Sequence, residues 1–190
     1  MNKKVKLLLI LHHSPPIHGA SKVGDIILNS KEIASSFDTR FIKIQSSDGI
    51  ESIGKFGIDK ILKSIMLFFN VFFRLLTHRP QKIYFTVSPF GFAFYRDLII
   101  SIPIKCYCFF KQCDVFYHYH ASGIKDFTLP SKLNLRLTNF FMKGVNIILI
   151  SKLMRSELSL VNSYKQVLYL NNGVENNLND KEFIKVINNR

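Results

Sequence analysis

Short apolar runs alternate with longer helical segments along almost the whole chain. The first run, Val5–Leu11, is continuously apolar, as parallel strands buried on both faces are. Five later runs have similar character and are separated by segments in which apolar residues recur at helical spacing. The expected strands are Val5–Leu11, Thr39–Gln45, Lys82–Val87, Asp114–Tyr119, Val145–Ile150 and Gln166–Leu170. This alternation predicts parallel βαβ units, and therefore an α/β fold with a doubly wound, mostly parallel, Rossmann-like sheet flanked by helices.

The helical segments carry recognisable start and stop signals. Ser21 is the expected N-cap of the first helix, Pro80 ends the second, and Pro103 forces a start or a kink in the third. The later expected helices cover Ile58–Thr77, Phe92–Lys111, Ser131–Lys143 and Lys152–Val161. In the second helix the apolar stripe is expected to comprise Ile58, Ile61, Leu62, Ile65, Phe68, Phe69, Phe72, Leu75 and Leu76, with Met66, Leu67, Val71 and Phe73 widening it beyond one buried face.

Composition narrows the class of protein. A chain of 190 residues with 47% hydrophobic residues can bury the core of one domain. Its net charge of +13 suits nucleic acid, anionic lipid headgroups or phosphorylated substrates. Nucleic acid is disfavoured, because no helix-turn-helix, RNP-like or zinc-finger pattern is present. The Walker loop and the Gly-x-Ser-x-Gly elbow are also missing, which disfavours a flavodoxin-like protein or a hydrolase.

Cys106, Cys108 and Cys113 are odd in number, which argues against a disulfide framework and fits a reducing cytosol. A zinc site that includes His118 is the alternative, but zinc ligands usually come as two pairs, so buried cysteine and no metal are favoured. The apolar start is too short for a signal peptide. The longest apolar stretch, Ile61–Leu76, is interrupted by polar residues and falls short of a spanning run.

Three loops follow strands at the edge where parallel sheets bind ligands: Pro15–Ser21, Ser88–Gly91 and His120–Gly123. Gly19 stands where the chain enters the first helix. A glycine there lets the backbone approach a phosphate, and the N–H groups of a helix start favour negative charge. The alternative is that this glycine is needed for the turn alone, because the full G-x-G-x-x-G pattern is not present.

The fourth strand ends in two histidines on the same face of the sheet, His118 and His120. His118 lies inside the strand and is expected to be a core residue, whereas His120 lies at the ligand edge and is expected to act in the site. Ser88 follows the third strand and is expected either to bind a substrate hydroxyl or to serve the turn before Pro89. Arg96 and the adjacent Asp97 form either a surface pair or an acceptor contact.

These motifs, in this order, resemble the N-terminal half of the family 4 glycosyltransferases, which have the GT-B architecture. The resemblance covers about residues 4–175. It rests on strand one followed by Ser-Pro-Pro-Ile-His-Gly-Ala-Ser, where many members have Pro-x-x-Gly-Gly or Pro-Pro-x-His-Gly. His-Tyr-His-Ala-Ser-Gly after strand four, Ser151 after strand five and Asn-Asn-Gly-Val after strand six support it.

The resemblance implies retaining transfer of a sugar from a nucleotide-diphosphate donor, with no further cofactor, in capsule, lipopolysaccharide or other cell-surface polysaccharide biosynthesis. It implies that His120 orients the reacting groups and that His18, Gly19 and Ala20 lie near the donor phosphates and the acceptor. Many members have a second glycine where this chain has Ala20. Ser88 and Ser122 are the expected acceptor-binding residues, and the acceptor is expected to be a glycan or a lipid-linked glycan.

The family has a second, donor-binding domain with a Glu-x7-Glu motif, which would follow Gly173. Residues 1–174 are therefore expected to be the acceptor-side domain, and residues 175–190 a linker or the start of the second domain. The chain is expected to be a truncated or split enzyme, inactive alone. The alternative is a non-catalytic binding module of the same fold that pairs with a separate chain carrying the donor-binding domain.

The wide apolar surface of the second helix also suggests a peripheral contact with a membrane. Lys132, Arg136 and Lys143 lie along one side of a later helix and suit anionic headgroups. A cytoplasmic location, peripheral on the inner face of the cell membrane, is therefore expected. The alternative is that the second helix is covered by its own sheet and that the charges are a solvated face.

Overall fold

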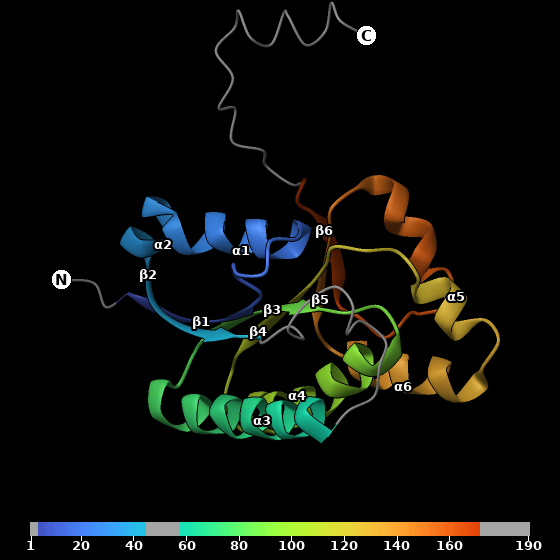
Figure 1. Ribbon diagram of the computed structural model, residues 1–190, viewed down its shortest axis with the longest axis horizontal. Helices are drawn as coiled ribbons and strands as arrows, with labels where there is room; N and C mark the ends of the chain where they lie inside the picture. Colours follow the sequence, from blue (N-terminus) through green and yellow to red (C-terminus); the bar gives the residue numbers. More distant parts are fainter. Residues whose placement is uncertain (1–3, 45–57, 172–190) are drawn as a thin grey trace, which may run out of the picture.

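A computed structural model of the chain describes residues 4–44 and 58–171. Within them, six parallel strands form one sheet in the order β2-β1-β3-β4-β5-β6 (Figure 1). The strands are β1 (Val5–Leu11), β2 (Phe37–Lys43), β3 (Lys82–Val87), β4 (Asp114–Tyr119), β5 (Asn146–Leu149) and β6 (Gln166–Tyr169). The order reverses direction at β1, so helices lie on both faces of the sheet. The predicted Rossmann-like, doubly wound α/β fold is confirmed.

The helices form two unequal layers. α1 (Gly19–Asn29) and the short α2 (Lys31–Ser36) lie on one face, and α3 (Ile58–His78), α4 (Gly91–Phe110) and α6 (Lys132–Met142) lie on the other (Figure 1). α5 (Ile124–Thr128) follows β4, and the 3-10 helix η2 (Lys152–Leu158) follows β5. α5 and η2 contact each other. The larger layer therefore covers the central strands, and the smaller one covers β1 and β2.

The alternation of side chains along each strand explains the core. On β3 and β4 the residues that point toward α3 and α4 are fully or almost fully buried: Ile83, Phe85, Val87, Val115, Tyr117 and Tyr119. On β1, alternate leucines belong to different layers. Leu8 and Ile10 join that main cluster, whereas Leu7, Leu9 and Leu11 pack against Ile27, Leu28 and Phe41 on the α1 side. The continuous apolar run of β1 thus reflects burial on both faces.

Four elements differ from the expected ones. β2 begins at Phe37 rather than Thr39, because Phe37 pairs with Val5 and packs on the leucines of β1. α2 was not expected, and Ser30 caps it by accepting a hydrogen bond from the Ile33 amide at 3.3 Å. α5 was not expected either, and the expected Lys152–Val161 helix is the 3-10 helix η2.

Pro103 does not start a separate helix, because α4 runs from Gly91 to Phe110 with Pro103 inside it. Proline cannot donate to the carbonyl of Ile99, but the side chain of Ile99 is 52% exposed, so water can reach that side of the helix. The same layer corrects the expectation for cysteine. Cys106 is exposed on α4, whereas Cys108 and Cys113 are partly buried.

The residues of α3 that are buried against the sheet differ from the expected ones. Leu67, Val71 and Leu75 are its buried apolar residues, and most of the expected stripe is exposed. Leu67 and Val71 had been expected to lie outside the main stripe. A helix that is apolar around most of its circumference leaves the choice of buried side to its partner, which the sequence of the helix alone does not specify.

The two edge strands differ in character. β2 pairs with β1, and its exposed or half-exposed residues include Asp38, Arg40 and Lys43. β6 pairs with β5 and has no second neighbouring strand within residues 4–44 and 58–171. It is short and partly apolar, with Leu168 and Tyr169 about 40% exposed. The expected linker, residues 175–190, and Asn172-Gly173-Val174 lie outside the described residues.

Candidate functional site

The carboxyl ends of β1, β3 and β4 bring three loops together. They are the segment from His12 to His18, the turn from Ser88 to Phe90, and the segment from His120 to Gly123. β1, β3 and β4 are neighbours in the sheet, and the strand order reverses at β1. Ligands of open α/β sheets bind in the crevice at this position. The side chains that border it therefore define the candidate site.

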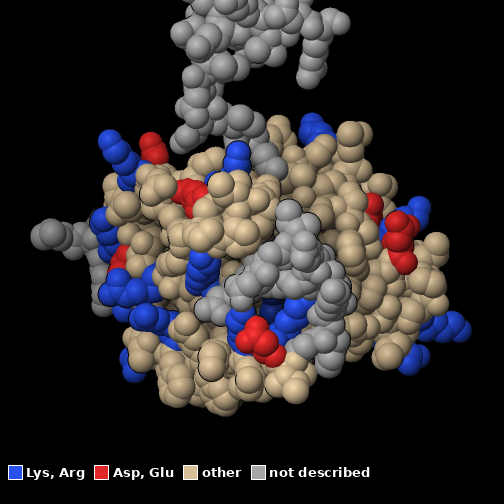
Figure 2. Space-filling model, viewed as in Figure 1, with Lys and Arg blue, Asp and Glu red and all other residues tan. Residues whose placement is uncertain are grey.

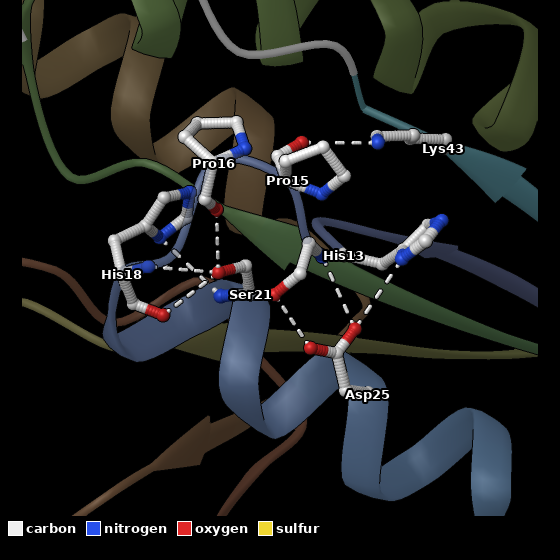
Figure 3. A network of polar contacts seen from close by, with 8 residues as sticks. His13, Pro15, Pro16, His18, Ser21, Asp25 and Lys43 are labelled. Atoms are coloured by element: carbon white, nitrogen blue, oxygen red, sulfur yellow. Dashed lines mark hydrogen bonds and ion pairs between the residues drawn. The ribbon is translucent and has the colours of Figure 1, made fainter. Parts of the chain in front are cut away.

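His18 caps α1 in a reciprocal arrangement with Ser21 (Figure 3). The Ser21 amide donates to His18 Nδ1 at 3.3 Å, and the His18 amide donates to Ser21 Oγ at 2.9 Å. The expected N-cap, Ser21, is therefore the third helical residue, and its hydroxyl also donates to the carbonyl of Pro16. Because Nδ1 accepts a hydrogen bond, a neutral His18 ring carries its proton on Nε2. Gly19 and Ala20 supply the first two amides of the helix.

Asp25 of α1 holds the His12–His18 segment through a second set of polar contacts (Figure 3). Its carboxylate accepts from the Ser14 amide at 3.1 Å and from the Ser14 hydroxyl at 2.6 Å, and it lies 3.3 Å from His13 Nδ1. The Ser14 hydroxyl is the main cause that lowers the pKa of Asp25. On β2, Lys43 donates to the carbonyl of Pro15 at 3.1 Å. The loop is thus held by polar contacts to two elements.

The two glycines of α1 have different surroundings. A Cβ at Gly19 would meet no atom within 4 Å. A Cβ at Gly24 would overlap the carbonyl oxygen of His12, so α1 packs directly on the backbone that follows β1. Gly24 therefore sets the distance between the helix and the strand, and Gly19 leaves open space beside the helix start. The turn alone gives no steric reason for glycine at position 19.

A cluster of imidazoles forms the centre of the site. The rings of His12 and His18 meet edge to face, with centroids 5.3 Å apart. His12 is partly buried, and this burial, followed by the charges of Arg96, His18 and His120, lowers its pKa to about 3. His12 is therefore neutral at physiological pH and can act as a hydrogen-bonding group beside the positive Arg96.

His120 lies at the end of β4 against His118, with ring centroids 4.0 Å apart. His118 is fully buried, and its Nδ1 shares a hydrogen bond with the hydroxyl of Tyr84 on β3. Burial lowers the pKa of His118 to about 3 and raises that of Tyr84, so both stay uncharged. His118 Nε2 has no hydrogen-bond partner among the described residues. The neutral His118 ring therefore forms the inner wall behind His120.

Arg96 and Asp97 form an interior pair, not a surface pair. Asp97 is fully buried, and its carboxylate lies 2.7 Å from Arg96 Nη2 and accepts from Arg96 Nε at 2.8 Å. The Ser88 amide also donates to it at 2.8 Å. Burial is the main cause that raises the pKa of Asp97, against the effect of Arg96. The carboxylate thereby holds the turn after β3 and orients the guanidinium near His12.

The loop after β4 is held by η2. Glu157 accepts from the Gly123 amide at 2.9 Å and from the Lys125 amide at 3.2 Å. Gly123 has a φ of +120°, and a Cβ there would overlap the ring of Phe90. Ser122 lies exposed in this loop. The start of α5 is therefore already occupied by a carboxylate of the chain itself.

The structure brings His18, Gly19 and His120 to the same edge, together with His12 and Arg96. Ser88 is held at the end of β3, where its amide donates to the buried Asp97. Sequence reasoning did not assign roles to His12, Asp25 or Glu157. His12 directly follows β1, so the rule that selected His120 could have selected it. Asp25 and Glu157 act through contacts across the fold that leave no local sequence signal.

The described residues include no cluster of three or more His, Cys, Asp or Glu side chains that could hold a metal ion. The groups present are the neutral rings of His12 and His118, the imidazoles of His18 and His120, one guanidinium and the amides of a helix start, which suit an anionic, hydroxyl-rich ligand. No model of a known protein family matches this chain, and no well-characterised protein matches it at a significant level of sequence similarity.

Proposed function

We propose that this chain forms the acceptor-side domain of a retaining glycosyltransferase that uses a nucleotide-diphosphate sugar in cell-surface polysaccharide biosynthesis. The observation that carries the proposal is the convergence of His12, His18, His120 and Arg96 beside the open start of α1. The order of the sequence motifs adds support. The parts match the needs of sugar transfer, namely a place for a diphosphate and side chains that can orient hydroxyls.

Each residue has a distinct role in this proposal. The amides of Gly19 and Ala20 and the dipole of α1 attract the donor phosphates, because the helix start carries partial positive charge. His120 contacts the sugar that is transferred and orients the reacting groups. His118 and Arg96 are positioning residues, since His118 backs the His120 ring and Arg96 acts beside His12. Ser122 contacts the acceptor.

The test measures binding of nucleotide sugars to the full chain by saturation-transfer NMR, which detects weak complexes. The panel contains uridine- and guanosine-diphosphate hexoses, the free diphosphates and inorganic phosphate. We expect a sugar nucleotide to bind and the His120→Ala variant to lose saturation of the sugar protons while retaining that of the base. The control variant is Lys111→Ala, because Lys111 is exposed at the C-terminal end of α4, whereas Arg96 lies near its start.

Failure of the whole panel to bind the folded wild-type chain would contradict the proposal. Equal sugar saturation in the wild type and His120→Ala would remove His120 from the site. The alternative, a non-catalytic module of the same fold, is distinguished by release of nucleoside diphosphate. If sugar transfer occurs in a complex with a donor-binding chain and is unaffected by His120→Ala, this domain is a binding module.

A further inference from the structure

The outward side of α3 consists entirely of apolar side chains. At about 100° per residue they cover a continuous arc of about 140° on the helix. Each is at least 36% exposed, and Ile58 is 78% exposed. The opposite side packs on the sheet through Leu67, Val71 and Leu75. The exposed residues are Ile58, Ile61, Leu62, Ile65, Met66, Phe69, Phe72, Phe73 and Leu76.

α4 continues this surface, because it packs beside α3 in the same layer (Figure 1). Its exposed residues also recur at spacings of three and four, and Phe109 at its end is 84% exposed. They are Phe92, Tyr95, Ile99, Ile102, Cys106 and Phe109. We call the two stripes together the α3/α4 face. Side chains of this size and exposure make a patch well above the largest, about 600 Å², of ordinary monomers.

Basic residues border the α3/α4 face. On α3 they include Lys63 and Arg74. Lys63 is seven residues before Asn70 and Arg74 is four residues after it, so these side chains lie on one flank of the helix. Beyond α4, Lys132 and Arg136 are exposed on α6, and Lys111 and Lys143 are exposed at the C-terminal ends of α4 and α6. The acidic residues of α3, α4 and α6 are Asp59, which pairs with Lys63 at 2.8 Å, and the buried Asp97. In Figure 2 the lowest part of the molecule, where α3 lies in Figure 1, is almost uncharged.

Further basic residues line a recess at the C-terminal end of α3. This recess of about 290 Å³ is lined by Arg74, Thr77 and His78 from α3 and by residues of β1 and β2. The strand residues are Lys6, Asp38 and Arg40. Three permanently cationic side chains against one carboxylate give the recess a positive potential. The recess lies on the part of α3 that is turned toward the sheet, so it adds to the positive potential at this end of α3 but is not part of the α3/α4 face.

We propose that the α3/α4 face docks in the plane of an anionic phospholipid bilayer, with its apolar side chains among the acyl chains and its basic border at the headgroups. Amphipathic helices of this kind lie at the interface, and basic residues near the surface are attracted to anionic headgroups. The inference stands independently of the proposed glycosyl transfer.

Two other arrangements fit less well. α3 is long and apolar enough to cross a bilayer by length and composition. Crossing would pull Leu67, Val71 and Leu75 out of the core, whereas in-plane docking keeps them buried. A second copy of the chain on this face would bring two basic borders together, which like-charge repulsion opposes. An anionic surface satisfies both the apolar face and its border.

The test uses the absence of tryptophan from the chain. A Phe69→Trp variant of the full chain places one indole on the α3/α4 face, and a Leu153→Trp variant places one on η2, where Leu153 is 87% exposed. Both are mixed with vesicles of phosphatidylcholine, with and without phosphatidylglycerol. We expect a blue shift and quenching by lipid-borne quenchers for Phe69→Trp with anionic vesicles, and neither change for Leu153→Trp. Equal responses of the two variants would overturn the proposal.

Co-sedimentation gives the second arm. The double substitution Phe69→Asp with Phe73→Asp changes exposed positions only, so circular dichroism should stay that of the wild type. We expect it to weaken binding to anionic vesicles at least tenfold, and the control Leu153→Asp to leave binding unchanged. Wild-type protein that fails to sediment with anionic vesicles would overturn the proposal. So would a stable wild-type dimer that the double substitution dissociates, because the occupant would then be a second copy.

Discussion

The two glycines of α1, Gly19 and Gly24, should respond differently to the addition of a Cβ. We expect Gly24→Ala to lower the free energy of unfolding by about 1–3 kcal/mol, because its methyl group would overlap the carbonyl of His12 and push the helix off the strand. Gly19→Ala meets no atom and should be neutral or slightly stabilising. Urea denaturation of both variants measures the difference. Equal stability of the two variants would contradict the packing described for Gly24.

The buried histidine of β4 makes stability depend on pH. His118 has a pKa of about 3 in the folded chain, below the ordinary 6.5, so between these values the unfolded state binds a proton that the folded state does not. Stability is therefore full above pH 6.5 and falls as the pH drops toward 3, by at most about 1.4 kcal/mol per pH unit for one group.

His118→Gln removes this titration while keeping a group that can bond to Tyr84. We expect the loss of stability between pH 7 and pH 5 to be smaller in the variant, as judged by urea denaturation at both values. Some loss should remain, since the pKa of His12 is lowered to about 3 as well. An identical pH dependence in the two proteins would show that His118 does not stay neutral in the folded state.

Position along a strand predicted some site residues and not others. Because parallel strands end at one edge, the placement of His120 followed from the apolar run before it. The cap of α1 did not, since serine is a far commoner cap than histidine and Ser21 lies only three residues from His18. The burial of Asp97 could not be predicted from the sequence either. A buried carboxylate needs hydrogen-bond donors, and only the fold brings Arg96 and the Ser88 amide to it.

At the scale of the element, α5 depends on a cap from elsewhere in the chain. Glu157 of η2 accepts from the amides of Gly123 and Lys125, and α5 has five residues. We expect Glu157→Ala to cost about 1–2 kcal/mol of stability, because two amides lose their acceptor. Glu157→Gln keeps a carbonyl oxygen and should cost less. Thermal unfolding of the two variants measures this, and equal melting temperatures would contradict it.

Helices and strands could be predicted from the sequence where their own residues determine their bounds. β1, β3 and β4 follow from apolar runs, and their bounds agree with the expected ones. α5 could not be predicted, since its cap comes from a residue more than thirty positions away. The buried side of α3 could not be predicted either, because leucine and phenylalanine occur around most of its circumference and the sheet selects among them.

At the scale of the whole molecule, one layer is far more apolar on its outer surface than an ordinary globular domain. We expect the full chain to form aggregates of no fixed stoichiometry in lipid-free buffer, and not a stable dimer, and to become monomeric in a non-ionic detergent, which would cover the α3/α4 face. Analytical ultracentrifugation with and without detergent measures this. The Phe69→Asp and Phe73→Asp double variant should be less associated without detergent. A monomeric wild type in plain buffer would contradict the expectation.

The two edge strands of the sheet, β2 and β6, differ in how readily another strand could pair with them. β2 ends the sheet with charged side chains, Asp38, Arg40 and Lys43, which discourage another strand from pairing there. β6 ends it with Val167, Leu168 and Tyr169, and among residues 4–44 and 58–171 no strand pairs with its outer side. An added strand is therefore expected to join beyond β6, where Val167, Leu168 and Tyr169 carry no charge that would disfavour pairing.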